Sequence, residues 1–160
     1  VFKCETRISV EYVFQKTIQN RNPVQHVKMA GRKSRHRSKT RKSVPLEKKR
    51  KYYSYQIFVN NNKGMNILES EKIHDPNIWY KNLENNVDVK KYIGIAVSVL
   101  DDEKVNFILQ IDFLDDFKVG KKDSEEEIKN FVDQYLLSYV NIVTLAYLLN
   151  LNSKKELNEV

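Results

Sequence analysis

The first part of the chain has a two-residue hydrophobic period. Residues 6–15 place apolar side chains at every second position with polar side chains between them, which predicts a β-strand with one buried face. The apolar members are Ile8, Val10, Tyr12 and Phe14, and the polar ones include Ser9 and Glu11. A polar turn follows, and residues 25–30 predict a short strand that returns beside the first.

The pattern between residues 52 and 80 is less regular. Residues 52–59 (YYSYQIFV) are rich in aromatic and β-branched side chains, which favours a strand. Residues 60–64 (NNNKG) then end it in a turn. We predict a short helix over residues 65–71 and a second helix that begins with Asp75 as the N-cap and Pro76 at the first helical position.

Two further strands are predicted at residues 92–100 and 105–113, joined by a tight hairpin at residues 101–104 (DDEK). In the first of them, large apolar side chains alternate with the small residues Gly94, Ala96 and Ser98. Small residues on one face of a strand leave room for a closely packed helix or for a ligand.

The last part of the chain predicts a long helix. Ser124 and Glu127 have the spacing of a capping box, and apolar side chains follow at helical spacing: Ile128, Phe131, Val132, Tyr135, Leu136, Tyr139 and Val143. No charged residue occurs from Gln134 through Ser153. That length approaches the roughly 20 residues of a membrane span, but polar side chains such as Asn141 dilute it. We favour a core helix that also makes a dimer or interdomain contact, with a membrane span as the alternative.

Charge is concentrated in one segment. Residues 28–51 contain twelve Lys or Arg and one acid, Glu47, a net charge of +11, whereas the rest of the chain holds sixteen bases and twenty acids, or −4. With 160 residues of which 41% are hydrophobic, the chain is long and apolar enough for one domain. We therefore expect a single domain at residues 1–152, a basic flexible loop at about 31–51, and a polar tail at 153–160.

Motifs for catalysis and metal binding are absent from the sequence. There is no GxSxG, GxxxxGK[ST], GxGxxG or HExxH pattern, and Cys4, His26, His36 and His74 lack the local spacing of a zinc site. We therefore expect a protein that is not an enzyme, and the sequence identifies no cofactor. The lone cysteine rules out an internal disulfide and indicates a reducing, cytoplasmic compartment. Because the chain begins at Val1, we expect a longer protein with further domains, which could be tethered to a membrane.

The order of the predicted elements resembles the GAF domain family. KYIGIAVSVLDDEKVNFILQIDF, with Asp112 near its end, is similar to the central GAF hairpin, and the last helix is similar to the closing GAF helix. Residues 66–84 would then form a helical cover. The resemblance implies an α+β fold, an antiparallel sheet with helices packed on one side, and a regulatory role. The cysteine motif of chromophore-bearing relatives and a cyclic-nucleotide signature are absent.

Two main functional hypotheses follow, beside a third in which the chain is a pure interaction or oligomerisation module whose interface is the uncharged helix from Gln134 onward. The first is a sensory or regulatory GAF-like module that binds a small ligand or a protein partner and signals through its C-terminal helix, which also forms a homodimer. Its ligand-binding residues would be Trp79, Tyr80, Gly94, Ala96 and Ser98. The second is an electrostatic clamp for an anionic partner, either nucleic acid or an acidic protein. Its contact residues would be Arg32, Arg35, Arg37 and Arg41. Ordinary packing of a helix on the sheet would account equally well for the five residues proposed to bind a ligand.

Overall fold

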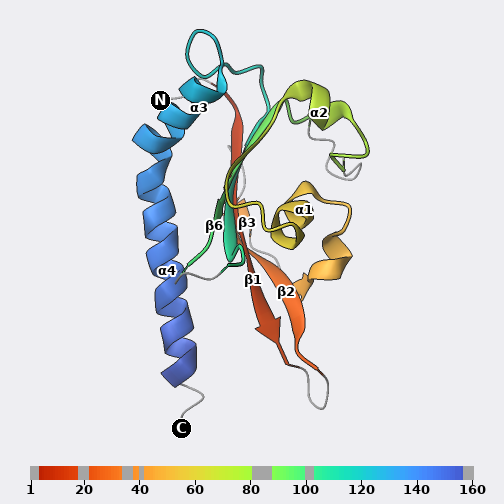
Figure 1. The fold of residues 1–160 in the computed structure, drawn as a ribbon, viewed down its shortest axis with the longest axis vertical. Coiled ribbons are helices and arrows are strands. Elements are labelled where there is room, and N and C mark those ends of the chain that lie inside the picture. The colour runs from red at the N-terminus through yellow and green to blue at the C-terminus, as the bar shows by residue number, and fades with distance from the viewer. Residues whose placement is uncertain are drawn as a thin grey trace. The chain divides into compact units, whose positions relative to one another are not determined.

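The computed structural model describes residues 4–17, 22–33, 38–39, 42–80, 88–99 and 103–156. The chain forms two compact units, Val1–Phe117 and Lys118–Val160, whose elements are drawn in Figure 1. The first unit is an antiparallel sheet with short helices, and the second contains a long C-terminal helix. The predicted α+β class is therefore confirmed.

The described strands form one antiparallel sheet in the order β3-β2-β1-β7-β6-β5, with β4 also paired to β2. The strands are β1 (Thr6–Lys16), β2 (Val24–Lys33), β3 (Ser38–Lys39), β4 (Val44–Pro45), β5 (Gly64–Leu68), β6 (Lys91–Val97) and β7 (Phe107–Phe113). The β1–β2 hairpin and the β6–β7 pair are those that the alternating patterns predicted. The predicted turn at residues 101–104 lies partly outside the described residues.

The helical segments of the first unit are η1 (Leu46–Lys49), α1 (Tyr53–Val59) and α2 (Ser70–His74). Apolar side chains from η1 and α1 pack with those of one sheet face into a core that includes Leu46, Ile57, Tyr92, Ala96 and Ile108. The sheet is thus covered on this face by the last part of the basic segment and by the helix that follows it.

The predicted strand at residues 52–59 is wrong, because most of that segment is helix α1. Its buried side chains, Ser54, Ile57 and Phe58, stand at positions i, i+3 and i+4, which is the spacing of one helix face. The aromatic and β-branched composition favours a strand locally, but packing of this face against the sheet outweighs that preference.

The predicted helix over residues 65–71 is also wrong. Gly64, at φ +81°, ends a turn from which the chain enters β5, and β5 pairs with β6 at the edge of the sheet. Helix α2 begins only at Ser70. Beyond it, Asp75 accepts a hydrogen bond from the backbone N–H of Asn77 at 2.9 Å, and residues 76–78 form a turn instead of the predicted helix. The rest of the predicted cover, residues 81–84, lies outside the described residues.

The basic segment was predicted to be a flexible loop, but its two ends form strands and a short helix. Strand β2 runs on to Lys33, β4 pairs with β2 opposite His26 and Val27, and η1 buries Leu46. The apolar residues Val44 and Leu46, spaced among the charges, explain why this end of the segment is held on the sheet.

The second unit contains α3 (Glu125–Phe131), the π-helical turn η3 (Val132–Leu136) and α4 (Leu137–Glu156). The predicted capping box is confirmed, since the Ser124 hydroxyl accepts from the Glu127 backbone N–H and the Glu127 carboxylate accepts from the Ser124 N–H. The helix continues past the predicted end at residue 152. Four residues of the predicted stripe are buried, namely Ile128, Phe131, Val132 and Leu136. Tyr135 and Tyr139 were predicted on the same stripe but are exposed, and Val140, which was not predicted, is buried.

Candidate functional site

Polar side chains are buried in the interior beneath η1 and α1. On β1 the predicted faces are reversed: Ser9 and Glu11 are only 2% and 3% exposed, whereas Ile8 on the supposedly buried face is 42% exposed. In the sheet register Arg7 lies beside Asp112, and Ser9 lies beside Gln110. On the other side of β7, Asp112 lies beside Tyr92 of β6. We call Arg7, Ser9, Glu11, Gln110 and Asp112 the polar row.

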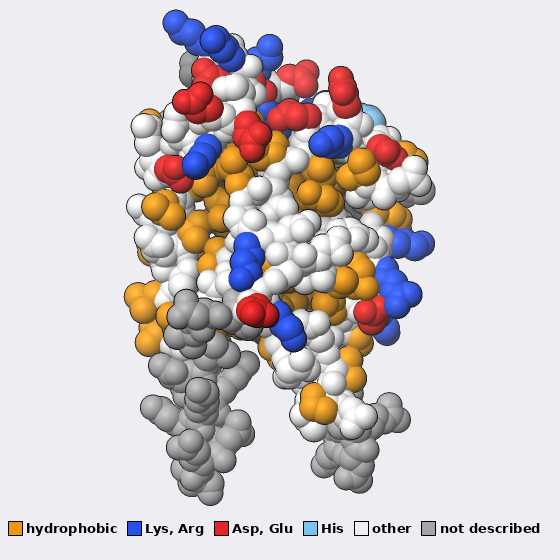
Figure 2. Space-filling model, in the orientation of Figure 1, with side chains coloured by type: hydrophobic (Ala, Val, Ile, Leu, Met, Phe, Trp, Pro, Cys, Tyr) orange, Lys and Arg blue, Asp and Glu red, His pale blue; other side chains and the backbone are white. Residues whose placement is uncertain are grey.

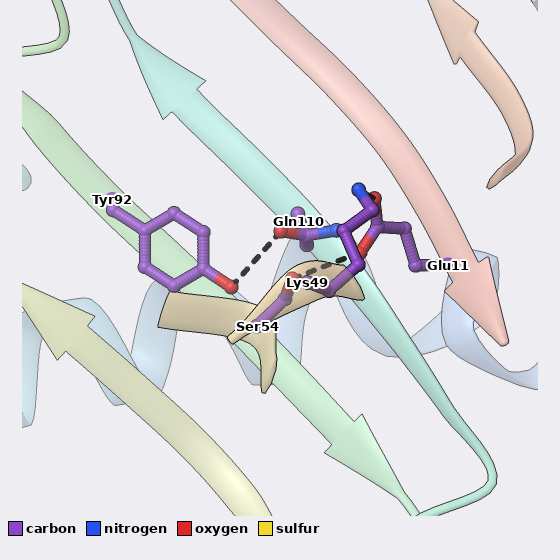
Figure 3. Close-up of polar contacts among 5 residues, drawn as sticks. All are labelled: Glu11, Lys49, Ser54, Tyr92 and Gln110. Atoms are coloured by element: carbon purple, nitrogen blue, oxygen red, sulfur yellow. Dashed lines mark hydrogen bonds and ion pairs between the residues drawn. The ribbon is translucent and has the colours of Figure 1, made fainter. Parts of the chain in front are cut away.

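Glu11 is bound by two groups from the covering segment (Figure 3). One carboxylate oxygen accepts from the Ser54 hydroxyl at 2.9 Å, and the other pairs with the Lys49 ammonium at 3.2 Å. Both partners come from η1 and α1, which explains how a strand position with a charged side chain can be buried. Glu11 therefore joins the end of the basic segment to the sheet.

Tyr92 lies flat along its own strand. Its hydroxyl donates to Gln110 at 3.3 Å (Figure 3), and its ring occupies the space above Gly94, where an added methyl group would be 2.8–2.9 Å from ring carbons. The rings of Trp79 and Tyr53 stand edge-on to it at 5.3 and 5.5 Å between centroids. Burial, followed by the charges of Asp112 and Glu11, raises the pKa of the Tyr92 hydroxyl well above its ordinary value.

The five predicted ligand-binding residues are not gathered around one space. Trp79 and Gly94 both contact Tyr92, and Ala96 is part of the core. Ser98 donates to the backbone carbonyl of Lys104 at 2.9 Å, within the connection between β6 and β7. Tyr80 instead contacts Tyr52, edge-on at 5.3 Å. Tyr92 thus fills the room that Gly94 leaves on β6.

Asp112 carries a buried negative charge beside Arg7, whose Nε donates to it at 2.6 Å. Burial raises the pKa of the Asp112 carboxyl above its ordinary 3.8, and the positive charges of Arg7 and Arg32 offset part of this effect. Arg32, the first residue of the predicted clamp, is thus half-buried at the polar row. The other clamp residues, Arg35, Arg37 and Arg41, lie outside the described residues.

The raised pKa predicts how Asp112 affects stability as the pH changes. A carboxyl whose pKa is higher in the folded state contributes stability that is fully present below pH 3.8 and is lost as the pH rises through its folded-state pKa. We expect the difference in unfolding free energy between the native protein and Asp112→Asn to fall from about pH 3.5 to pH 7, as measured by urea unfolding. A difference that grows with pH would instead show that Arg7 dominates.

A second group of side chains forms a surface at the end of the basic segment. The Lys49 ammonium lies 4.5 Å from the centroid of the Tyr52 ring, and the Lys51 ammonium lies 5.5 Å from that of Tyr80. These distances are within the range of cation–π contacts. Lys42 and Lys48 are exposed nearby in the chain, and Tyr80 is 38% exposed.

We use the name basic–aromatic surface for Lys51, Tyr52 and Tyr80, which are joined by ring contacts, together with Lys42 and Lys48, which are exposed in the same stretch of chain. Figure 2 shows Lys and Arg side chains along the flank that carries α1. The sequence contains a signal for this surface, since KKRKYY places four bases directly before two tyrosines. The pairing of Tyr80 with Tyr52 and Lys51 has no such signal, because those residues are about 30 positions apart.

No family model matches the chain, and neither does any curated protein. Among the described residues, no group of three or more His, Cys, Asp or Glu side chains is arranged to hold a metal ion. Within the described part of the chain, the helical segment Glu125–Asn150 has the length and composition of a membrane span. The resemblance to GAF domains stays a prediction.

Proposed function

We propose that this protein is a non-catalytic module that binds single-stranded nucleic acid through its basic–aromatic surface. The observation that carries the proposal is the pair of lysine–tyrosine contacts at the end of the basic segment. Lysines on such a surface neutralise phosphates, while an exposed aromatic ring stacks on a base.

The surface is held in place by the fold. Leu46 is buried in the core, and Lys49 is bound to Glu11 on β1, so the chain that carries Lys48 and Lys51 is fixed to the sheet at two points. A fixed surface loses less conformational entropy on binding than a free loop does. The sequence of residues 28–51 contains further bases, which add charge of the same sign to this part of the chain.

Removal of three lysines tests the electrostatic part of the proposal. Each phosphate contact on a single strand contributes about −0.7 to the slope of log affinity against log salt. In Lys42→Ser/Lys48→Ser/Lys51→Ser we therefore expect the slope to flatten by about 2 and the affinity to fall about 100-fold at about 0.1 M salt. Fluorescence anisotropy with a short labelled oligonucleotide across a salt series measures both.

The matched control is Lys118→Ser/Lys121→Ser/Lys122→Ser, which removes the same charge from exposed positions in the second unit. We expect its binding to stay close to that of the native protein. Equal losses in the two triple variants would show that net charge, and not this surface, determines binding. Absence of binding by the native protein at low salt would overturn the proposal.

The aromatic part is tested separately at Tyr80. Loss of base stacking costs about 1–3 kcal/mol per base, so we expect Tyr80→Leu to bind a single strand about 5- to 150-fold more weakly. Tyr80→Trp retains an aromatic face and should bind like the native protein. Duplex binding, in which bases are not available for stacking, should change little. Equal weakening on single and double strands would exclude stacking.

A second candidate function is a GAF-like regulatory module with a small ligand between sheet and cover, signalling through the C-terminal helix. It is supported by the charged side chains of the polar row in the interior beside the aromatic rings of Trp79 and Tyr92. Trp79 is the single tryptophan, so its emission reports on this region. A screen of small polar ligands by thermal shift, followed by Trp79 emission, tests it. Ligands that stabilise the protein without changing that emission would count against the candidate.

A further inference from the structure

Helix α4 carries an exposed apolar stripe. Five large apolar side chains in η3 and α4 are between 59% and 64% exposed. They are Tyr135, Tyr139, Ile142, Leu145 and Leu149. Hydrophobic side chains on α4 are visible in Figure 2. So much exposed apolar surface on one helix indicates that a partner covers it.

The spacing of the stripe is that of a helix-pairing seam. Tyr135, Ile142 and Leu149 recur every seven residues, and Leu145 falls between the last two at the position that completes the heptad pattern. Tyr139 lies at the edge of the same stripe, three residues before Ile142. A seven-residue repeat keeps one line of side chains facing another helix along its length. We call these five residues the α4 seam.

We propose that the α4 seam pairs with the α4 seam of a second copy of this chain. The seam belongs to a stretch without any charged residue, from Gln134 through Ser153. Charged residues beside a seam select partners by attraction and repulsion. Since none is present here, two identical seams meet without like-charge repulsion in either orientation.

A lipid bilayer fits the helix less well than a second copy. Asn141 is exposed beside the seam, and Gln134 and Asn150 are exposed as well. In hydrocarbon these amide groups would lose their hydrogen bonds to water, which costs free energy. A helix that pairs along one face only keeps its other face in water and avoids this cost. A one-sided heptad seam is the geometry that a partner helix requires.

Ile142→Lys/Leu149→Lys tests the seam, because it sets like charges against each other in the pair. Its matched control is Asn62→Lys/Asn77→Lys, which adds the same charge at exposed positions of the first unit, away from the seam. By light scattering after size exclusion, we expect the native protein to shift from 19.0 kDa toward twice that mass as its concentration rises. The seam variant should stay monomeric at concentrations at least tenfold higher, while the control variant still associates. Circular dichroism confirms that each variant is folded.

Cross-linking provides a second measurement that does not depend on charge. In a Cys4→Ser background, Leu145→Cys should form a disulfide-linked dimer under mild oxidation, whereas Asn141→Cys should form much less. A native protein that stays monomeric at all concentrations would overturn the proposal. So would equal behaviour of the seam and control variants, or sedimentation of the native protein with neutral phosphatidylcholine vesicles in place of self-association.

Discussion

Glu11→Ala is expected to lower the free energy of unfolding by about 3–5 kcal/mol, the cost of breaking a buried ion pair by removing one partner. The variant leaves Lys49 without its carboxylate and takes away the acceptor of the Ser54 hydroxyl. It also releases the connection between the basic segment and β1. Urea unfolding followed by circular dichroism measures the change.

Glu47 provides the matched control for Glu11. Its pair with Arg50 joins side chains that are 59% and 72% exposed, and exposed pairs of this kind contribute little to stability because water and salt screen them. Glu47→Ala should therefore be close to the native protein in stability. If Glu11→Ala costs no more than Glu47→Ala, the carboxylate of Glu11 is not buried in solution.

A paired replacement distinguishes the two parts of the Glu11 effect. Glu11→Leu/Lys49→Met removes both charges and fills the space with apolar groups. Replacing a buried ion pair in this way is often neutral or stabilising, so we expect the double variant to regain most of the lost stability. Because Lys49 also contacts Tyr52, the same variant should weaken nucleic-acid binding slightly even when it is fully folded.

The local patterns of the sequence were sufficient for several elements of the fold. The alternation in β1 and in the β6–β7 pair predicted strands, and Ser124 with Glu127 predicted the start of a helix, because each signal lies within a few residues. Helix α1 was mispredicted for the opposite reason. Its aromatic residues prefer strands locally, and only the sheet and η1 around it decide in favour of the helix.

The candidate site depends on contacts between distant positions, and these could not be predicted. The alternation in β1 assigned Glu11 to solvent, since a lone acid among apolar residues normally faces water. Its partner Lys49 is 38 residues away within a run of similar charges, so nothing in the sequence distinguishes it from Lys48 or Lys51. At Gly94 the sequence predicted room for a helix or a ligand. The side chain that approaches it, Tyr92, comes from the same strand.

Gly94→Ala is expected to destabilise the protein by about 1–3 kcal/mol, the usual cost of overpacking a core. The added methyl group would meet the hydroxyl of Tyr92 and come within 2.8–2.9 Å of its ring carbons. The ring cannot move aside easily, because it is buried between Trp79 and Tyr53 and its hydroxyl is bound to Gln110. Urea unfolding measures the loss, and a shift in Trp79 emission should accompany it.

Gly31→Ala is the control for this substitution, since nothing lies within 4 Å of a methyl group added there. It should be neutral or stabilising by up to about 1 kcal/mol, as expected for glycine replaced by alanine in a strand. In the Tyr92→Leu background, Gly94→Ala should cost much less, because the ring that clashes is gone. If instead Gly94→Ala is as stable as the native protein, Tyr92 is free to leave the surface of β6. The small-residue face would then be open to a ligand, which would favour the regulatory function over the nucleic-acid function.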